Sequence, residues 1–299
     1  MIPLPITEWL NGSLGRSVLI DTVQSTARSS VWRIHAGDRP LVVKAYAEDR
    51  PWRCEVHAYR AWTAVLAPYS PRLVAASAEH RCLVLEAMPG LPMKSLRMGS
   101  DSGLSAAAAL RIYGRAGELA RRFRDAAEGP WFGDAASDGA APAGTCVDPV
   151  AFMAADFRQW SVPALAECAL DDRERGLASW VDSHLDAYAG MRPVPVNNDY
   201  DTGNWLVHHG ALSGVIDFEF VRWGVEDETF LPLWTRGYAR MCAGAEEAFL
   251  SGYGARMDET AQVRKRIAVI KQALVALVCN TRWGTADDVA ASRALLRNL

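Results

Sequence analysis

Pro89 and Gly90 divide the sequence into two parts whose apolar residues follow different patterns. Before them, over residues 17–85, short β-branched segments alternate with turn residues, which predicts antiparallel strands. Within this part, residues 51–66 carry apolar side chains at three- and four-residue steps and predict one amphipathic helix. After Pro89 and Gly90 the patterns are mainly helical. The fold class that follows is α+β, with a β-rich lobe over 1–87 and a larger helical lobe over 88–299.

The helical patterns of the second part cover 104–127, 149–188, 246–280 and 286–298. Residues 134–149 lack apolar periodicity, so a mobile surface loop is expected there. Residues 194–224 differ from their surroundings, because they predict two or three short strands with polar residues between them. We therefore expect a hairpin embedded in the helical lobe, and a ligand in the cleft between the two lobes.

The composition excludes several classes of protein. Half of the 299 residues are apolar (50%), enough for a large core, and 32 Lys and Arg against 35 Asp and Glu give a net charge of −3. Such a chain has no overall basic surface, so no nucleic-acid partner is expected. The six cysteines form no C-x-x-C pair, and we find neither an export signal nor a membrane-spanning run. We expect a cytoplasmic protein with reduced thiols and no membrane partner, as a monomer or homodimer.

Oxygen ligands gather in the expected loops of 194–224. Asp199 and Asn204 lie five residues apart on one loop, and Asp217 and Glu219 flank Phe218 after the next strand. Carboxylate and amide oxygens favour Mg²⁺ and substrate phosphates over zinc or iron, and Asp199 could accept a proton from an attacking hydroxyl. Asn and Asp also cap ordinary turns, which is the alternative for the D-x-x-x-x-N spacing alone. Asp217 favours the metal site, because it follows an apolar strand directly and a buried carboxylate needs a partner.

A third element lies in the first lobe. Lys44 follows three apolar residues of an expected strand, and Glu55 comes eleven residues later on the expected helix. A lysine on a strand can be held by a glutamate on a neighbouring helix so that its ammonium group reaches nucleotide phosphates. Each residue alone is commonplace on a protein surface. Their order, followed by the D-x-x-x-x-N and Asp-Phe motifs, favours a nucleotide site over coincidence.

The order of these motifs over residues 17–227 resembles the aminoglycoside phosphotransferase and choline kinase group of small-molecule kinases. The resemblance implies the two-lobed fold of the protein kinases. It also implies that Asp199 is the catalytic residue that orients or deprotonates the acceptor hydroxyl. Asn204 and Asp217 correspond to the magnesium ligands of the family.

The resemblance further implies how the nucleotide binds. The strand lysine, paired with the helix glutamate, would hold the phosphates. The loop 24–30 would cover the phosphates. The connector 86–88 would bind adenine through its backbone, and the Pro-Gly that follows it agrees with the family. The residues assigned in this way are Lys44, Glu55, Ser25, Ser29, Glu86 and Met88.

The sequence departs from the family in two places. Asn197 stands where the family has a histidine, two residues before the catalytic Asp, and we expect it to take over the structural hydrogen bonding of that histidine. The loop 24–30 contains no glycine, so backbone amides and Ser hydroxyls would have to hold the phosphates.

The acceptor would lie on the helical lobe, near the catalytic loop and the segment after Asp217. Acidic groups there would favour a polycationic substrate such as an aminoglycoside or a basic peptide antibiotic. Aromatic walls would favour a quaternary amine such as choline, or a flat or apolar antibiotic. The alternative for most aromatic residues is that they fill the core. The candidates are Asn198, Glu219, Trp223, Glu228, Trp234 and Tyr238.

Together these features predict a kinase that uses ATP or GTP with Mg²⁺ to phosphorylate a hydroxyl group of a small, cationic molecule. Antibiotic inactivation or self-protection is the role that the resemblance favours. The first alternative is a kinase for choline, another amino alcohol or another metabolite. An alternative of another class is a catalytically silent protein that binds a nucleotide, for which Asn197 and the glycine-free loop are the motivation.

Overall fold

The structure is a computed structural model that describes residues 1–15, 17–99, 103–135, 145–235 and 242–299. For 17–20 it describes the backbone alone. Most of the loop expected over 134–149 lies outside the described residues. None of the described helices has both the length and the apolar character needed to cross a membrane.

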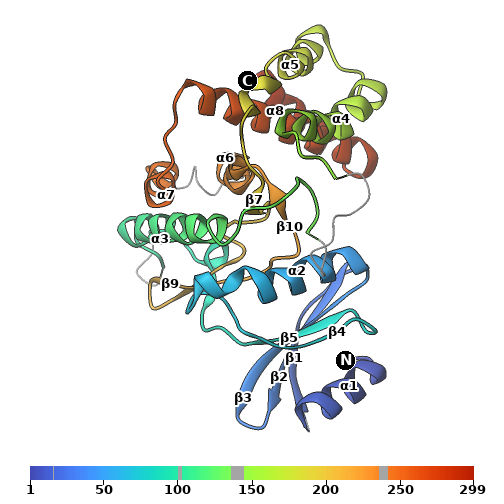
Figure 1. Cartoon of the computed structure of the whole chain (residues 1–299), viewed down its shortest axis with the longest axis vertical. Helices are drawn as coiled ribbons and strands as arrows, with labels where there is room; N and C mark the ends of the chain where they lie inside the picture. Colours follow the sequence, from blue (N-terminus) through green and yellow to red (C-terminus); the bar gives the residue numbers. More distant parts are fainter. Residues whose placement is uncertain (16, 100–102, 136–144, 236–241) are drawn as a thin grey trace.

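The first lobe contains the antiparallel sheet that the sequence predicts (Figure 1). Its strand order is β1-β2-β3-β5-β4, and every neighbouring pair is antiparallel. Turn residues such as Gly37, at a φ of 62°, separate the β-branched segments and let each strand fold back on the last. The bounds are β1 Ser17–Ser25, β2 Ser29–Ala36, β3 Arg39–Tyr46, β4 Leu73–Ser77 and β5 Cys82–Glu86.

Helices α1 (Leu4–Leu14) and α2 (Asp49–Ala61) pack with the sheet, and a 3₁₀ turn η1 (Thr63–Leu66) follows α2. The sequence predicts α2 and η1 as one helix over 51–66. It does not predict α1, which buries only Ile6 and Leu10, a single pair four residues apart, against the sheet.

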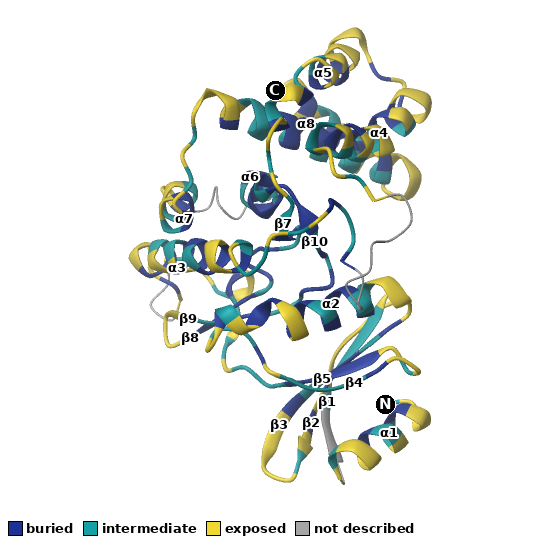
Figure 2. Cartoon of the chain, viewed as in Figure 1, coloured by how far each residue is buried: buried dark blue, intermediate teal, exposed yellow. Residues whose placement is uncertain are grey.

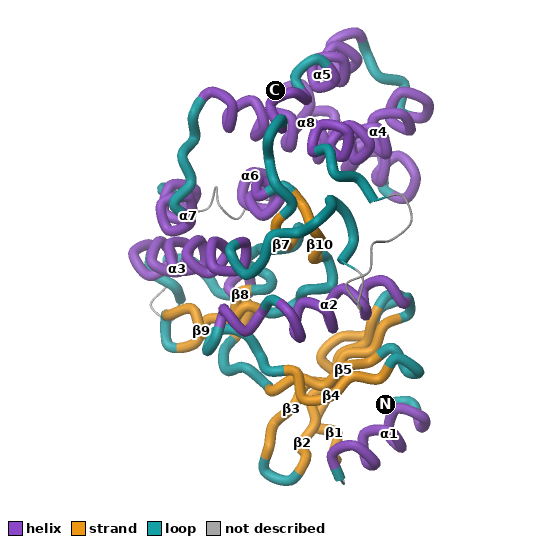
Figure 3. Tube along the Cα trace, viewed as in Figure 1, coloured by secondary structure: helices purple, strands orange, loops and turns teal. Residues whose placement is uncertain are grey.

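The second lobe is helical, as expected, and it also contains a small group of strands on the side facing α2 (Figure 3). Two predicted helices are interrupted. The helix expected over 149–188 breaks near Ala169, which has a φ of 46°, and the one over 246–280 breaks at Gly254, with a φ of 78°. The bounds are α3 Ala106–Arg124, α4 Pro149–Glu167, α5 Asp172–Asp182, η3 Leu185–Tyr188, η4 Glu226–Phe230, α6 Leu231–Thr235, α7 Ala245–Tyr253, α8 Glu259–Trp283 and α9 Ala286–Arg297.

Residues 194–224 form four strands where the sequence predicts two or three. Strands β8 and β9 make the expected hairpin, but β7 pairs with β10, so that Asn197 lies opposite Val221. The loop between β7 and β8 and the segment between β9 and β10 are thereby fixed at both ends and held beside each other. The bounds are β7 Val194–Asn197, β8 Trp205–His208, β9 Ala211–Val215 and β10 Val221–Gly224.

Pro89 and Gly90 follow the five-stranded sheet and precede the mainly helical part of the chain. Gly90 has a φ of 114°, and a Cβ atom there would lie 2.6 Å from the carbonyl oxygen of Val207, so no other residue fits without a shift. Strand β6 (Leu91–Pro92) then pairs with β8, and the 3₁₀ turn η2 (Met93–Ser95) follows.

The largest core cluster joins both lobes. Trp62, at the end of α2, packs edge-on against Trp223 of β10, with ring centroids 4.6 Å apart, and Tyr59 meets Phe218 at 5.4 Å. Figure 2 shows α2 with buried residues along its length between the sheet and the helical lobe. Burial of this aromatic surface holds the two lobes together, so the groups at their junction have fixed positions.

Candidate active site

Lys44 lies at the centre of the junction between the lobes. Its side chain, on β3, is only 9% exposed, and its Nζ donates to Oε2 of Glu55 on α2 at 2.8 Å. Glu55 also accepts hydrogen bonds from the hydroxyl of Tyr46 and, at 3.3 Å, from the backbone N–H of Phe218. The glutamate is thus buried with its hydrogen-bonding capacity met, which is the condition under which a buried charge is tolerated.

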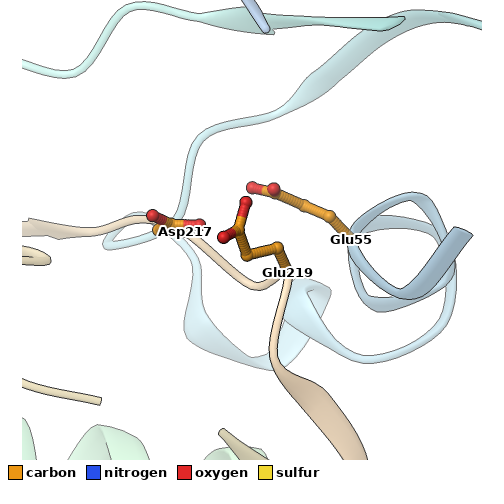
Figure 4. A group of neighbouring side chains, drawn as sticks. All are labelled: Glu55, Asp217 and Glu219. Carbon is orange, nitrogen blue, oxygen red and sulfur yellow. The ribbon is translucent and has the colours of Figure 1, made fainter. Parts of the chain in front are cut away.

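The same ammonium group binds two carboxylates of the second lobe. Nζ of Lys44 lies 2.7 Å from Oδ1 of Asp217 and 2.9 Å from Oε2 of Glu219. Figure 4 shows these two carboxylates and that of Glu55 facing one another. Burial acts most strongly on Lys44 and disfavours its charge, but the three carboxylates together outweigh burial and hold the pKa of Lys44 well above its ordinary value. For Glu55, burial dominates and raises the pKa of the carboxyl group.

Hydrogen bonds between its first and last residues close the loop from Asp199 to Asn204. Nδ2 of Asn204 donates to the carbonyl oxygen and to Oδ2 of Asp199, both at 2.9 Å. The D-x-x-x-x-N spacing therefore makes one turn of chain in which the amide of the second residue orients the carboxylate of the first. Asn204 turns Nδ2 to the aspartate, so its Oδ1 is the atom that could coordinate a metal ion.

Asn197 joins the two acidic motifs. Its Oδ1 accepts the backbone N–H of Asp199 at 3.0 Å, and its Nδ2 donates to the carbonyl oxygen of Asp217 at 3.0 Å. Asp217 has a φ of 68°, a conformation that non-glycine residues rarely adopt and that surrounding contacts must hold in place. Asn197 therefore links the backbone of Asp199 to that of Asp217.

The donor set suits a hard divalent cation. Asp217 keeps 30% of its side chain exposed, and with the amide oxygen of Asn204 it offers the oxygen ligands that Mg²⁺ prefers. The carboxylates of Glu55, Asp217 and Glu219 could also hold an ion by their spacing. In this structure, however, the Lys44 ammonium is bound to all three, so lysine supplies the positive charge there.

Residues 24–30, expected as a loop, form the end of β1, a turn over 26–28 and the start of β2, and a threonine orders the turn in place of glycines. Oγ1 of Thr26 accepts the backbone N–H groups of Arg28 at 3.2 Å and of Ser29 at 3.1 Å, and the N–H of Thr26 donates to the carbonyl oxygen of Ser29 at 2.9 Å. Ser25 and Ser30 share a hydrogen bond between their hydroxyl groups at 3.2 Å. Three of the loop's backbone amides are therefore already engaged within the loop.

Arg28 extends from this loop to the second lobe. Its Nη2 donates to Oε1 of Glu219 at 3.1 Å, and its guanidinium lies over the ring of Phe220, 4.9 Å from the centroid. Sequence reasoning did not single out this residue. The signal was nevertheless present, because Arg28 is the one charged residue in the glycine-free loop.

The connector 86–88 lies at the edge of the sheet. Glu86 pairs with Arg72 at 2.6 Å, and Ala87 donates its N–H to the carbonyl oxygen of Pro40 at 3.1 Å. The backbone N–H of Met88 has no hydrogen-bond partner among the described residues.

The acceptor candidates are spread over different environments. Trp223 and Trp234 are buried, at 8% and 5% exposure, as in the alternative in which aromatic residues fill the core. Glu228 is buried and paired with Arg222 at 2.6 Å, and Glu219 belongs to the Lys44 group. Oδ1 of Asn198 is buried without a hydrogen-bond partner in the described part of the chain, and Tyr238 lies outside the described residues.

A strand lysine held by a helix glutamate, facing an Asp-Asn loop across two lobes, defines a phosphotransferase of the protein-kinase-like type. Residues 20–265 match the model of the phosphotransferase enzyme family. This range covers most of the chain, so the protein belongs to that family and the predicted resemblance is confirmed.

Solved structures of aminoglycoside phosphotransferases share the fold. A thermostable mutant of APH(4)-Ia in a ternary complex with ADP and hygromycin B has a TM-score of 0.71 at 15% identity, over 98% of this chain and 97% of that chain. The gentamicin complex of APH(2")-IIa has a TM-score of 0.69 at 16% identity, over 100% and 97%. No curated protein sequence matches the chain. The α+β, kinase-like architecture predicted from the sequence is thus confirmed.

Proposed function

We propose that this phosphotransferase moves the γ-phosphoryl group of ATP or GTP to a hydroxyl group of a small, cationic molecule. The observation that carries the proposal is the contact of 2.7 Å between Lys44 Nζ and Asp217 Oδ1. It brings the phosphate-binding group of the first lobe to the acidic motif of the second, beside the loop that holds Asp199.

In this proposal the lobes divide into 1–87 and 88–299, and the nucleotide lies between them. The N–H of Met88, unpartnered among the described residues, would bind the base beside Glu86. Lys44 would bind the phosphates, and Ser25 and Ser29, at the facing ends of β1 and β2, would cover them. Asn204 and Asp217 would hold Mg²⁺, which when bound neutralises phosphate charge.

Asp199 is the proposed catalytic residue. Asn197 fixes its backbone and Asn204 fixes its carboxylate, so the acidic group is presented in a defined orientation. The acceptor oxygen forms a bond to the γ-phosphorus, the bond from that phosphorus to the bridging oxygen breaks, and the hydroxyl proton passes to Asp199. The buried Oδ1 of Asn198, which has no partner among the described residues, would accept a hydrogen bond from the acceptor molecule.

An antibiotic is the acceptor class that we favour, with resistance or self-protection as the role. The similar structures include complexes with hygromycin B and gentamicin, which are cationic. The choline alternative has less support, because Trp223 and Trp234 lie in the core. The silent alternative has less support as well, since Lys44 and Asp217 are intact and joined.

The test is phosphoryl transfer followed by mass spectrometry. Aminoglycosides, basic peptide antibiotics and choline are each incubated with the protein, Mg²⁺ and either ATP or GTP. A single added phosphoryl group on a cationic antibiotic supports the proposal. The same gain on choline alone would instead show an amino-alcohol kinase. Nucleotide binding without transfer to any compound would favour the silent protein. Asp38→Asn, an exposed turn variant, serves as the preparation control.

A further inference from the structure

The loop over the nucleotide site lacks the usual means of binding phosphate. In a glycine-rich loop, free backbone N–H groups approach the phosphate oxygens. Here the N–H groups of Thr26, Arg28 and Ser29 are all bonded within the loop, two of them to the hydroxyl of Thr26. A triphosphate bound beneath this loop would therefore meet fewer free backbone donors than it would in a glycine-rich loop.

Arg28 is the charged donor that the loop offers. Its side chain is 63% exposed, and among the described residues its guanidinium makes a single ion pair, through Nη2 to Glu219. Four of the five N–H donors of an arginine therefore remain for a ligand. The guanidinium fork matches the oxygens of a phosphate as it does those of a carboxylate.

The position of Arg28 relates it to Lys44. Glu219 bridges the two cations, with Oε2 on Lys44 at 2.9 Å and Oε1 on Arg28 at 3.1 Å. The arginine also covers Phe220, so it lies over the segment that begins with Asp217. In kinase-like sites the strand lysine binds the inner phosphates, and the metal held by the aspartate bridges to the terminal one.

We propose that Arg28 binds the terminal phosphate of the nucleotide, and that Glu219 holds its guanidinium in position until the nucleotide enters. The inference rests on the proposed function and adds a residue to it. A purely structural link between the lobes is the competing explanation. An ion pair with one partner this exposed contributes little to stability, whereas the aromatic core at α2 already joins the lobes.

Calorimetric titrations with the magnesium complexes of AMP-PNP and ADP separate these explanations. Arg28→Ala should weaken AMP-PNP binding by about tenfold or more and change ADP binding by less than about twofold, because ADP lacks the terminal phosphate. Arg28→Lys keeps the charge without the fork, so its affinity for AMP-PNP should fall between those of Arg28→Ala and the wild type. Arg33→Ala is the matched control, since Arg33 is 55% exposed on the same sheet and pairs with Asp21 at 2.9 Å.

The outcomes distinguish the inference from the proposed function. Equal losses for both nucleotides in Arg28→Ala, or no loss for either, would overturn the role of Arg28 while nucleotide binding by the wild type stands. Failure of the wild type to bind either nucleotide would overturn the proposed function, and the inference with it. A thermal unfolding curve of Arg28→Ala that matches the wild type shows that the comparison concerns a folded protein.

Discussion

Lys44 and Asp217 are 173 residues apart in the sequence, yet Nζ of the lysine lies 2.7 Å from Oδ1 of the aspartate. One residue comes from the sheet of the first lobe and the other from the segment before β10. The contact places the ammonium group of Lys44 against three carboxylates. Pairing with the ammonium group therefore offsets the repulsion among the three carboxylates.

Lys44→Met should destabilise the protein in a pH-dependent way. Without the ammonium group, the carboxylates of Glu55, Asp217 and Glu219 repel one another, and the free energy of unfolding should fall by about 3 kcal/mol near pH 8. Burial already raises the pKa of Glu55, and loss of the lysine raises it further. A raised carboxyl pKa means that the folded state binds the proton more tightly, so stability falls as pH rises through that pKa. Urea unfolding should show a smaller deficit near pH 5, whereas a deficit independent of pH would contradict this account.

Asn197→Ala should impair phosphoryl transfer more than nucleotide binding. The variant loses the acceptor for the Asp199 N–H and the donor to the Asp217 carbonyl oxygen. Misplacement of the catalytic carboxylate should lower kcat by about 100-fold. Asn197→His restores a ring with one donor and one acceptor, as in the family, and should retain more activity than Asn197→Ala. Equal kcat values for the two variants would show that these hydrogen bonds do not position Asp199.

Asp199→Asn should slow transfer strongly and leave nucleotide affinity intact. The amide keeps the shape of the side chain and can still accept from Asn204, but it cannot take the hydroxyl proton. Loss of a general base typically lowers kcat by about 10²–10⁴-fold. Steady-state kinetics with the identified acceptor measures the loss of kcat, and nucleotide titration measures the affinity. Full turnover in this variant would show that another group receives the proton.

Asp156→Asn tests a buried ion-pair network behind the site. Asp156, on α4, binds Lys271 and lies 3.3 Å from Arg222, and both cations are nearly buried. Burial alone would raise the pKa of this carboxyl group, but Arg222 and Lys271 lower it from 3.8 to about 2. The variant leaves Lys271 without its partner and should lose about 3 kcal/mol of unfolding free energy near pH 7.

The pH dependence of that loss has a definite sign. Because the pKa of Asp156 is lower in the folded state, its stabilisation is present above about pH 4 and disappears as pH falls towards 2. The difference in unfolding free energy between wild type and variant should therefore shrink over this range. Asp172→Asn, at a fully exposed carboxylate on α5, is the control and should match the wild type throughout. A constant difference would mean that the pKa of Asp156 is not depressed.

Local patterns were enough to predict much of the fold and the central residues of the site. Strand alternation and helical periodicity depend on neighbours within a few residues, so the sheet, α2, α3 and the β8–β9 hairpin follow from the sequence. Lys44, Glu55, Asp199 and Asp217 could be identified because each occupies a recognisable place in such an element.

Tertiary structure decided what depends on contacts between distant segments. Glu219 was a candidate for the acceptor site; in the structure its carboxylate binds Lys44, and Arg28 reaches it across 191 residues. Trp223 and Trp234 could have lined a binding site or a core, and packing against other aromatic rings placed them in the core. Such contacts form only when distant segments pack together, and residue spacing along the chain does not predict which segments meet. The sequence by itself determined which elements and reactive groups exist, and tertiary packing determined which of those groups meet.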